Sequence, residues 1–159
     1  MRDRNVRTLV TRIVHAPRHH VYAAYTDPAV LSRMMGIHAI VDATGPLDRA
    51  GTIFTERVFG PHRSRSEVLA ADPPRLHEMR GTTFFGLGYR WIAHFTEMVG
   101  STEVSIDAEV ILPGIVGRVL GVLVIAEAVE RSMQRRLATF ATLVERRDSP
   151  SSDPPDERR

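Results

Sequence analysis

The sequence contains no cysteine and no lysine. Without cysteine the chain cannot form a disulfide, a thiolate nucleophile, a zinc-thiolate site or an iron-sulfur cluster. Without lysine it cannot form a Schiff base through a side-chain amine, and it lacks the lysine of a phosphate-binding loop. The two absences together exclude a large part of covalent and metal-dependent enzymology.

Long apolar runs are also missing. No segment has 18 uninterrupted apolar residues, and the N-terminal MRDRNVRTLVTR lacks the apolar core of a signal peptide. We therefore expect a cytoplasmic protein with no stable membrane insertion. The 21 basic side chains are all arginine and are spread among 19 acidic ones, for a net charge of +2. This small, dispersed charge argues against a nucleic-acid partner.

Several motifs of hydrolases, zinc proteases and redox enzymes are absent. The chain has no Gly-x-Ser-x-Gly, no His-Glu-x-x-His and no Gly-x-Gly-x-x-Gly that opens a helix. It does have three close histidines, His15, His19 and His20. His15 precedes Pro17, where a strand ends, and the other two are neighbours about 100° apart on a helix, so they cannot easily bind one ion. We expect a solvated helix start, no metal and no cofactor.

The chain has the length and composition of one domain. Its 159 residues are 43% hydrophobic, which is enough for one packed core. Residues 1–146 are expected to form that domain, and the Pro- and Ser-rich residues 147–159 a disordered tail. Residues 6–14 read as a strand and are followed by a helix from Pro17. A second short helix is expected over residues 29–35, with Asp27 as its N-cap and Gly36 at its end.

Residues 37–112 read as a meander of antiparallel strands. Turn residues interrupt this region at intervals of about ten residues. Within the last two expected strands, apolar side chains alternate with polar ones, so one face of the sheet is covered and the other meets solvent. The alternating apolar positions are Tyr89, Trp91, Ala93 and Phe95, then Val104, Ile106, Ala108 and Val110.

After residues 113–114 the apolar period changes to that of a helix and holds for about thirty residues. The apolar stripe contains Val119, Val122, Ala126, Val129, Met133, Leu137, Phe140 and Val144. Over residues 115–125 apolar side chains lie on nearly all sides of the expected helix, so we expect this segment to contact a further partner. A cavity lid, a homodimer contact and a transient membrane contact remain open for this segment.

The order of these elements resembles that of the START-like, birch-allergen-type superfamily, in particular its polyketide cyclase/dehydrase branch. The resemblance covers residues 6–146. It rests on the opening I-x-APRHHVY…TDP, on EVLAADPPRL at 67–76, on YRWIAHF at 89–95 and on the closing helix. It implies an α+β helix-grip fold, in which a curved antiparallel sheet of about seven strands wraps a long C-terminal helix in the order β-α-α-β6-α.

The resemblance also implies a cavity between the sheet and the long helix that binds apolar or aromatic small molecules such as lipids, steroids and polyketides. A half-covered curved sheet under one helix agrees with this on physical grounds. The uses of the fold range from cyclisation and dehydration to carrying a ligand, so the fold does not decide the function.

Three polar residues are candidate catalytic groups. An aldol cyclisation with loss of water needs a base near a carbon acid, a cation or donor near the carbonyl oxygen, and an acid for the leaving hydroxyl. Tyr89 is the first candidate because it shares a face with Trp91 and Phe95, although a structural core tyrosine is the alternative. Arg80 and Glu56 complete the set, with Arg80 as the expected inward cation. For these two the inward face is open, and a structural Arg–Glu pair is the alternative.

Strand 62–69 has two alternative registers. If Val68 points inward, Arg63 and Arg65 point to solvent, which we favour; in the reverse register a buried arginine would polarise a ligand carbonyl. His94 is expected on the outer face. On the last helix Glu130 and Arg136 flank the apolar stripe, where an ion pair with the sheet is favoured over a place at the cavity edge.

The expected ligand-binding residues are mainly apolar. They are Trp91, Phe95, Phe54, Val58, His77, Val104, Ile106, Ala126, Val129, Met133 and Leu137. Two functions remain open. One is a polyketide cyclase/aromatase-like enzyme that promotes aldol closure and water loss. The other is a non-catalytic carrier that binds or sequesters a lipid-like molecule.

Overall fold

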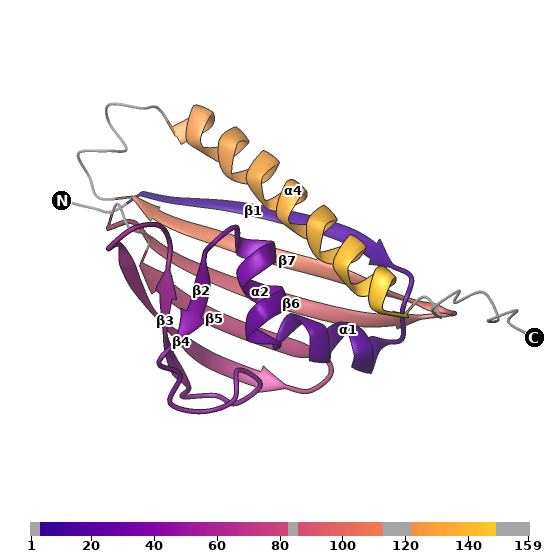
Figure 1. Cartoon of the computed structure of the whole chain (residues 1–159). Coiled ribbons are helices and arrows are strands. Elements are labelled where there is room, and N and C mark those ends of the chain that lie inside the picture. The colour runs from indigo at the N-terminus through magenta and orange to yellow at the C-terminus, as the bar shows by residue number, and fades with distance from the viewer. Residues whose placement is uncertain (1–3, 83–85, 113–121, 149–159) are drawn as a thin grey trace, which may run out of the picture.

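The computed structural model describes residues 4–82, 86–112 and 122–148. Seven strands and three helices are found there, shown with their labels in Figure 1. In chain order they are β1 (Arg4–Val14), α1 (Arg18–Tyr25), α2 (Pro28–Met35), β2 (Ala39–Val41), β3 (Ile53–Arg57), β4 (Arg63–Asp72), β5 (Leu76–Thr82), β6 (Gly88–Met98), β7 (Ser101–Leu112) and α4 (Val122–Asp148).

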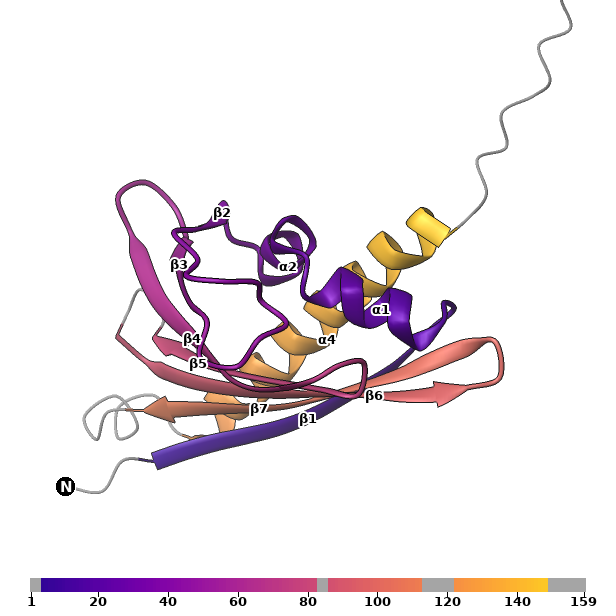
Figure 2. The same ribbon diagram turned by 90° about the horizontal axis from the view of Figure 1, so that it is seen from below.

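The seven strands form one antiparallel sheet in the order β1-β7-β6-β5-β4-β3-β2. Seen from below, the sheet curves and all three helices lie on its concave side (Figure 2). This arrangement confirms the α+β helix-grip fold and the order of elements expected from the sequence. None of the helices in the described ranges is both long and apolar enough to cross a membrane.

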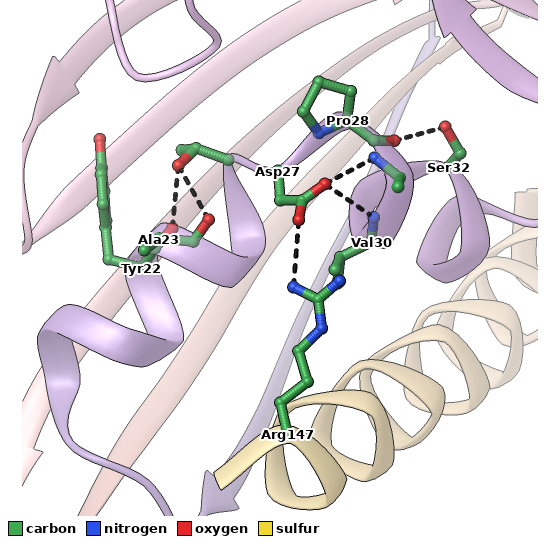
Figure 3. A network of polar contacts seen from close by, with 9 residues as sticks. Tyr22, Ala23, Asp27, Pro28, Val30, Ser32 and Arg147 are labelled. Atoms are coloured by element: carbon green, nitrogen blue, oxygen red, sulfur yellow. Dashed lines mark hydrogen bonds and ion pairs between the residues drawn. The ribbon is translucent and has the colours of Figure 1, made fainter.

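The segment between β1 and β2 folds as its residues predict. Pro17 is the N-cap of α1, which buries Val21, Tyr22 and Tyr25 against the sheet. The Asp27 carboxylate caps α2 by accepting hydrogen bonds from the backbone N–H groups of Ala29 and Val30, at 2.8 and 3.4 Å (Figure 3). Gly36 ends α2 with φ of 70°, a left-handed conformation that costs glycine little.

The C-terminal end of α4 is fastened to this segment. Arg147 donates a hydrogen bond of 3.0 Å to the second carboxylate oxygen of Asp27 (Figure 3), and His20 lies 3.1 Å from a carboxylate oxygen of Asp148. The helix therefore continues to Asp148 and includes the first two residues of the expected tail, 147–159. Residues 149–159 lie outside the described part of the chain.

The faces of the central strands follow the favoured register. Ser64, Ser66 and Val68 of β4 point inward, whereas Arg63 and Arg65 are exposed on the outer face. On β6 the residues Tyr89, Trp91, Ala93 and Phe95 are buried and His94 is exposed. The histidines His15, His19 and His20 are exposed as well.

One half of the space between α4 and the sheet is filled by the chain itself. The Tyr25 ring lies edge-on to Phe95 and Phe140, with ring centroids 5.3 and 5.7 Å apart. The predicted apolar stripe of α4 continues this packing through Leu137 and Val144, both buried. We call this region, with Tyr25, Phe95, Leu137 and Phe140 at its centre, the packed end.

Most of the segment expected to need a further partner, residues 115–125, lies outside the described ranges. Residues 113–121 lie outside the described ranges, as does Val119 of the predicted stripe. The three suggested roles of this segment, including a homodimer contact, stay predictions from the sequence.

Candidate functional site

The other half of the space holds a cavity of about 510 Å³. It lies between α4, the C-terminal end of α2 and the inner face of the sheet, and most of its wall is apolar. The residues that line it are Met35, Gly36, Ile37, Glu56, Val58, Ser64, Leu87, Tyr89, Trp91, Val110, Ile125, Ala128, Val129, Ser132, Met133 and Arg136.

Three polar side chains meet in one wall of the cavity, and we call Glu56, Ser66 and Tyr89 the polar cluster. Glu56 of β3 is only 3% exposed. Its Oε1 accepts a hydrogen bond of 2.6 Å from the Ser66 hydroxyl and a second, short one from the Tyr89 hydroxyl. The two hydroxyl oxygens lie 2.8 Å apart. Glu56 and Tyr89 line the cavity, and Ser66 supports them from behind.

The strand register explains how residues 33 positions apart reach one another. Ser66 pairs with Gly81 across β4 and β5, and Gly81 pairs with Tyr89 across β5 and β6. A Cβ atom on Gly81 would lie 2.2 Å from the Ser66 Oγ and 2.7 Å from the Tyr89 hydroxyl oxygen. Because no side chain stands at Gly81, the Tyr89 ring crosses β5 and delivers its hydroxyl to Glu56.

Burial governs the electrostatics of the polar cluster. It raises the pKa of Glu56 above the ordinary value, although the hydrogen bonds from Ser66 and Tyr89 and the charge of Arg136 oppose the rise. Burial, followed by the neighbouring Glu56, raises the pKa of Tyr89 well above its ordinary value. Tyr89 is therefore a phenol and a hydrogen-bond donor at neutral pH, and Glu56 is a stronger base than an exposed carboxylate.

A cation on α4 shares the cavity with this cluster. Arg136 lines the wall, and its guanidinium carbon lies 5.5 Å from the centre of the Trp91 ring, a cation–π contact. Burial lowers the pKa of Arg136, and the charge of Glu56 opposes that effect. Arginine remains charged in spite of such a shift, so the cavity brings together a carboxyl, a phenol and a guanidinium.

One further hydroxyl in the wall is left unsatisfied by the described part of the chain. Ser64 is 5% exposed and lines the cavity, and its Oγ is buried without a hydrogen-bond partner among the described residues. A buried hydroxyl of this kind costs free energy unless another group satisfies it. A ligand in the cavity is in the right place to do so.

Six of the residues expected at the site line the cavity, and they include both polar and apolar side chains. They are Glu56, Val58, Tyr89, Trp91, Val129 and Met133. For Glu56, whose orientation the sequence left open, the structure gives the inward face. The side chain of Tyr89 also points inward, as its alternation with Trp91 indicated.

Arg80 is a clear departure from the expectation. It was expected as the inward cation, but its side chain is 61% exposed on the outer face of β5, where it bonds Glu67 of β4 at 2.9 Å. The physical reason is the alternation along β5, which places His77, Met79 and Gly81 inside. The expected inward Arg80 is therefore corrected, and the inward arginine is Arg136.

Most of the other expected ligand contacts are part of the protein's own packing. Phe54, Phe95, Val104, Ile106 and Leu137 are fully buried in the core and do not line the cavity. Ala126, on α4, is absent from the lining too. Tyr25 from α1 and Phe140 from α4 fill the space that a ligand would need beside Phe95.

His77 has a structural environment. Its Nε2 donates a hydrogen bond of 2.8 Å to the Leu47 carbonyl, and its ring lies edge-on to Tyr25 at 5.3 Å. Burial lowers the pKa of His77, so the ring is neutral at neutral pH. It fastens the loop that contains Leu47 to the packed end and does not reach the cavity.

The sequence reasoning missed Ser64, Ser66 and Arg136 as site residues. A signal existed for the serines, since the favoured register of strand 62–69 put them on the inner face with Val68. Arg136 was placed beside the apolar stripe, but an ion pair with the sheet was favoured for it. Among the described residues, no group of three or more His, Asp or Glu side chains has the arrangement of a metal site.

Solved structures with the same fold come from bacteria and plants. A protein of Chromobacterium violaceum is 18% identical, with 88% of this chain and 98% of that chain covered and a TM-score of 0.65. Norcoclaurine synthase of Thalictrum flavum, solved with dopamine and hydroxybenzaldehyde, is 14% identical, with coverages of 93% and 91% and a TM-score of 0.64. Ara h 8.0201 is 10% identical, with coverages of 89% and 98% and a TM-score of 0.68.

These likenesses establish the birch-allergen-type helix-grip fold. A comparison with curated protein sequences gave no significant match. A family model does match, described as polyketide cyclase / dehydrase and lipid transport, and it spans residues 6–145. That range includes the described strands except the first two residues of β1, the described helices except the last three residues of α4, and the whole lining of the cavity. The chain belongs to the polyketide cyclase/dehydrase and lipid transport family.

Proposed function

We propose that this protein binds a small apolar or aromatic carbonyl compound in its cavity and catalyses proton transfer on it, as in the aldol cyclisation and dehydration of a poly-β-ketone. One observation carries the proposal. A buried glutamate, a phenol and an arginine side chain converge in a mainly apolar wall. A cavity that served only to hold an apolar molecule would gain nothing from these groups, because their burial costs free energy.

Glu56 is the proposed base. Its carboxylate would take a proton from the carbon between two ketone groups, and its raised pKa makes this transfer more favourable. The negative charge then lies on the ketone oxygen as an enolate. Arg136 would stabilise that oxygen from the opposite side of the cavity, where partial burial strengthens the attraction.

Ring closure and water loss then need no group beyond this set. The enolate carbon attacks a second ketone, a carbon–carbon bond forms, and the resulting alkoxide recovers the proton held by Glu56. In the dehydration, Glu56 removes a second proton from the same carbon and gives it to the leaving hydroxyl, so that the C–O bond breaks, a carbon–carbon double bond forms, and water leaves with Glu56 again a carboxylate. Tyr89, which stays a phenol, donates a hydrogen bond that orients the Glu56 carboxylate and stabilises its ionised form.

The comparison with norcoclaurine synthase supports a carbonyl substrate. That protein, with the same fold, was solved with dopamine and hydroxybenzaldehyde, an aromatic amine and an aromatic aldehyde. At 14% identity the likeness concerns the fold, and it supports the view that this fold accommodates an aromatic carbonyl compound.

A carrier is the second candidate function. The observation that favours it is the wall itself, in which apolar side chains such as Val58, Trp91 and Met133 predominate. The hydrophobic-ligand-binding fold serves both functions, so the difference between them is turnover.

A turnover assay on a synthetic poly-β-ketone thioester tests the enzyme proposal. We expect Glu56→Gln to lower kcat by about a hundredfold or more, because the base is lost, and Tyr89→Phe to lower it by about tenfold. Arg80→Ala is the matched control, since Arg80 is exposed and on the outer face; it should leave kcat unchanged. Native mass spectrometry of the purified protein, with extraction, identifies any ligand that it carries.

The assay separates the two functions. If Glu56→Gln keeps full turnover, the base is elsewhere and the mechanism is wrong. If no variant and no wild-type protein turns over the thioester while mass spectrometry finds a bound lipid, the protein is a carrier.

A further inference from the structure

The guanidinium of Arg136 is half-buried in the cavity wall and has no direct anionic partner among the described residues. Its environment consists of the Trp91 ring, the apolar face of α4 and the cavity itself. It forms neither a hydrogen bond nor an ion pair with any residue in the described ranges, although arginine carries five N–H donors. Arg131 and Arg147 on the same helix, by contrast, pair with Glu127 and Asp27.

Glu56 does not neutralise Arg136 at close range. The Oε1 atom of Glu56 already accepts two hydrogen bonds, from Ser66 and Tyr89. The pKa of Glu56 is raised and that of Arg136 is lowered, so for both groups the attraction between them is smaller than the cost of burial. A partly buried charge without a close counter-charge lowers stability. The cavity thus contains a cation whose donors point at no protein acceptor.

Ser64 adds a second unsatisfied group on the facing strand. Its hydroxyl, in a side chain that is 95% buried, lines the same cavity and has no partner. Two polar groups from opposite walls, α4 and β4, are therefore left for a molecule between them. The side chains around these two groups are mainly apolar, so they fit a ligand whose remaining part is uncharged.

We infer that the ligand is a compact aromatic or unsaturated acid, with a carboxylate, enolate or phenolate oxygen that binds Arg136. This inference rests on the proposed function and deepens it, because it names the substrate class of the same cavity. The planar guanidinium donates two parallel hydrogen bonds to a carboxylate, or directs its N–H groups at the single oxygen of an enolate or phenolate. The Ser64 hydroxyl donates to a second oxygen of the ligand, and the ring system lies beside Trp91.

Two fluorescent probes that differ only in charge test the inference. 8-Anilinonaphthalene-1-sulfonate carries an anionic group, and N-phenyl-1-naphthylamine is the same aromatic body without it. Titration of the wild-type protein with each probe gives two dissociation constants. We expect Arg136→Gln to weaken binding of the sulfonate about tenfold, equivalent to about 1.4 kcal/mol, and that of the neutral amine less than twofold.

Matched variants separate the charge from the shape of the side chain. Arg136→Lys keeps the cation and should restore most of the affinity for the sulfonate. Arg135→Gln removes the neighbouring, exposed arginine and should change neither constant. Ser64→Ala should weaken sulfonate binding about twofold to threefold, because one donor is lost. Thermal unfolding of every variant verifies that it is folded.

The outcomes distinguish this inference from the proposed function. Loss of sulfonate affinity alone, with rescue by lysine, supports it. Equal loss for both probes, or no loss for either, overturns the acidic-ligand inference and leaves the hydrophobic cavity and its chemistry intact. If neither probe binds the wild-type protein, the ligand-binding cavity itself is wrong, and the inference falls with it.

Discussion

The two ends of the space between α4 and the sheet are built from the same elements and differ in what fills them. At the packed end, the Tyr25 ring contacts Phe95 of β6 and Phe140 of α4, and all three side chains are fully buried. At the cavity, one turn earlier on α4 and four residues earlier on β6, Arg136 and Trp91 face about 510 Å³ of open volume. The packed end stabilises the fold, whereas the burial of charged groups in the cavity wall lowers the stability.

The source of the difference is α1. This short helix brings Tyr25 over the far halves of β5 and β6, where its ring contacts His77, Phe95 and Phe140. At the other end, where the cavity lies, the described helices contribute no aromatic side chain to the lining, and α2 ends there at Gly36. One aromatic side chain from a remote segment thus decides which half of the sheet is core and which half is available to a ligand.

The largest expected effect is a difference between the two ends in how far a truncated side chain lowers the free energy of unfolding. Leu137→Ala should lower the free energy of unfolding by about 3 kcal/mol, because it opens a void in close packing. Met133→Ala, one turn away but facing the existing cavity, should lose only about 1.5 kcal/mol, since the cavity term is largely absent. Chemical denaturation of both variants measures the difference. Equal losses would show that the cavity is closed in solution and would erase the contrast.

The next effect concerns the access route of Tyr89. Gly81→Ala should cost about 2 kcal/mol, because the new methyl group overlaps Ser66 and Tyr89. It should also reduce turnover of the thioester by more than tenfold by moving the Tyr89 hydroxyl away from Glu56. Gly88→Ala in the same hairpin is the control, since its methyl group would meet only the Ile111 side chain at 3.3 Å. A Gly81→Ala protein with wild-type turnover would show that the Tyr89–Glu56 bond is dispensable.

The smallest effects are in the pH dependence of stability, where the two ends should have opposite signs. The raised pKa of Glu56 means that the folded protein binds a proton that the unfolded chain has already released above its ordinary value of 4.5. This residue therefore lowers stability as pH rises above that value. Glu56→Gln should stabilise the protein by about 1 kcal/mol at pH 7, with the gain shrinking towards pH 4.

His77 at the packed end acts in the other direction. Because its pKa is lowered, the unfolded chain binds a proton below the ordinary value of 6.5 that the folded protein does not bind. Stability should fall as pH drops from 7 to 5, by about 1 kcal/mol. His77→Gln keeps a donor for the Leu47 carbonyl without a titrating group, so it should flatten this dependence. Thermal unfolding of both variants from pH 4 to 8 gives both results. If the two residues changed the stability with pH in the same direction, the comparison would be contradicted.

The sequence by itself determined the architecture. The Pro17 helix start, the Asp27 cap, the Gly36 stop and the alternation of 62–69 and 89–95 are local signals, and each describes the structure closely. Local signals suffice here because caps, turns and strand faces depend on neighbours in sequence. They also placed Tyr89 and Trp91 on the inner face.

Only the tertiary structure decided which inward residues form the site. Phe95 and Trp91 share one face of one strand, yet one is core and the other lines the cavity, because Tyr25 packs over Phe95 alone. Arg80 was expected as the inward cation and Arg136 was not, but the pleat of β5 turned the first outward while the position of α4 turned the second inward. Alternation fixes a face of the sheet; the helix that crosses it fixes what that face touches.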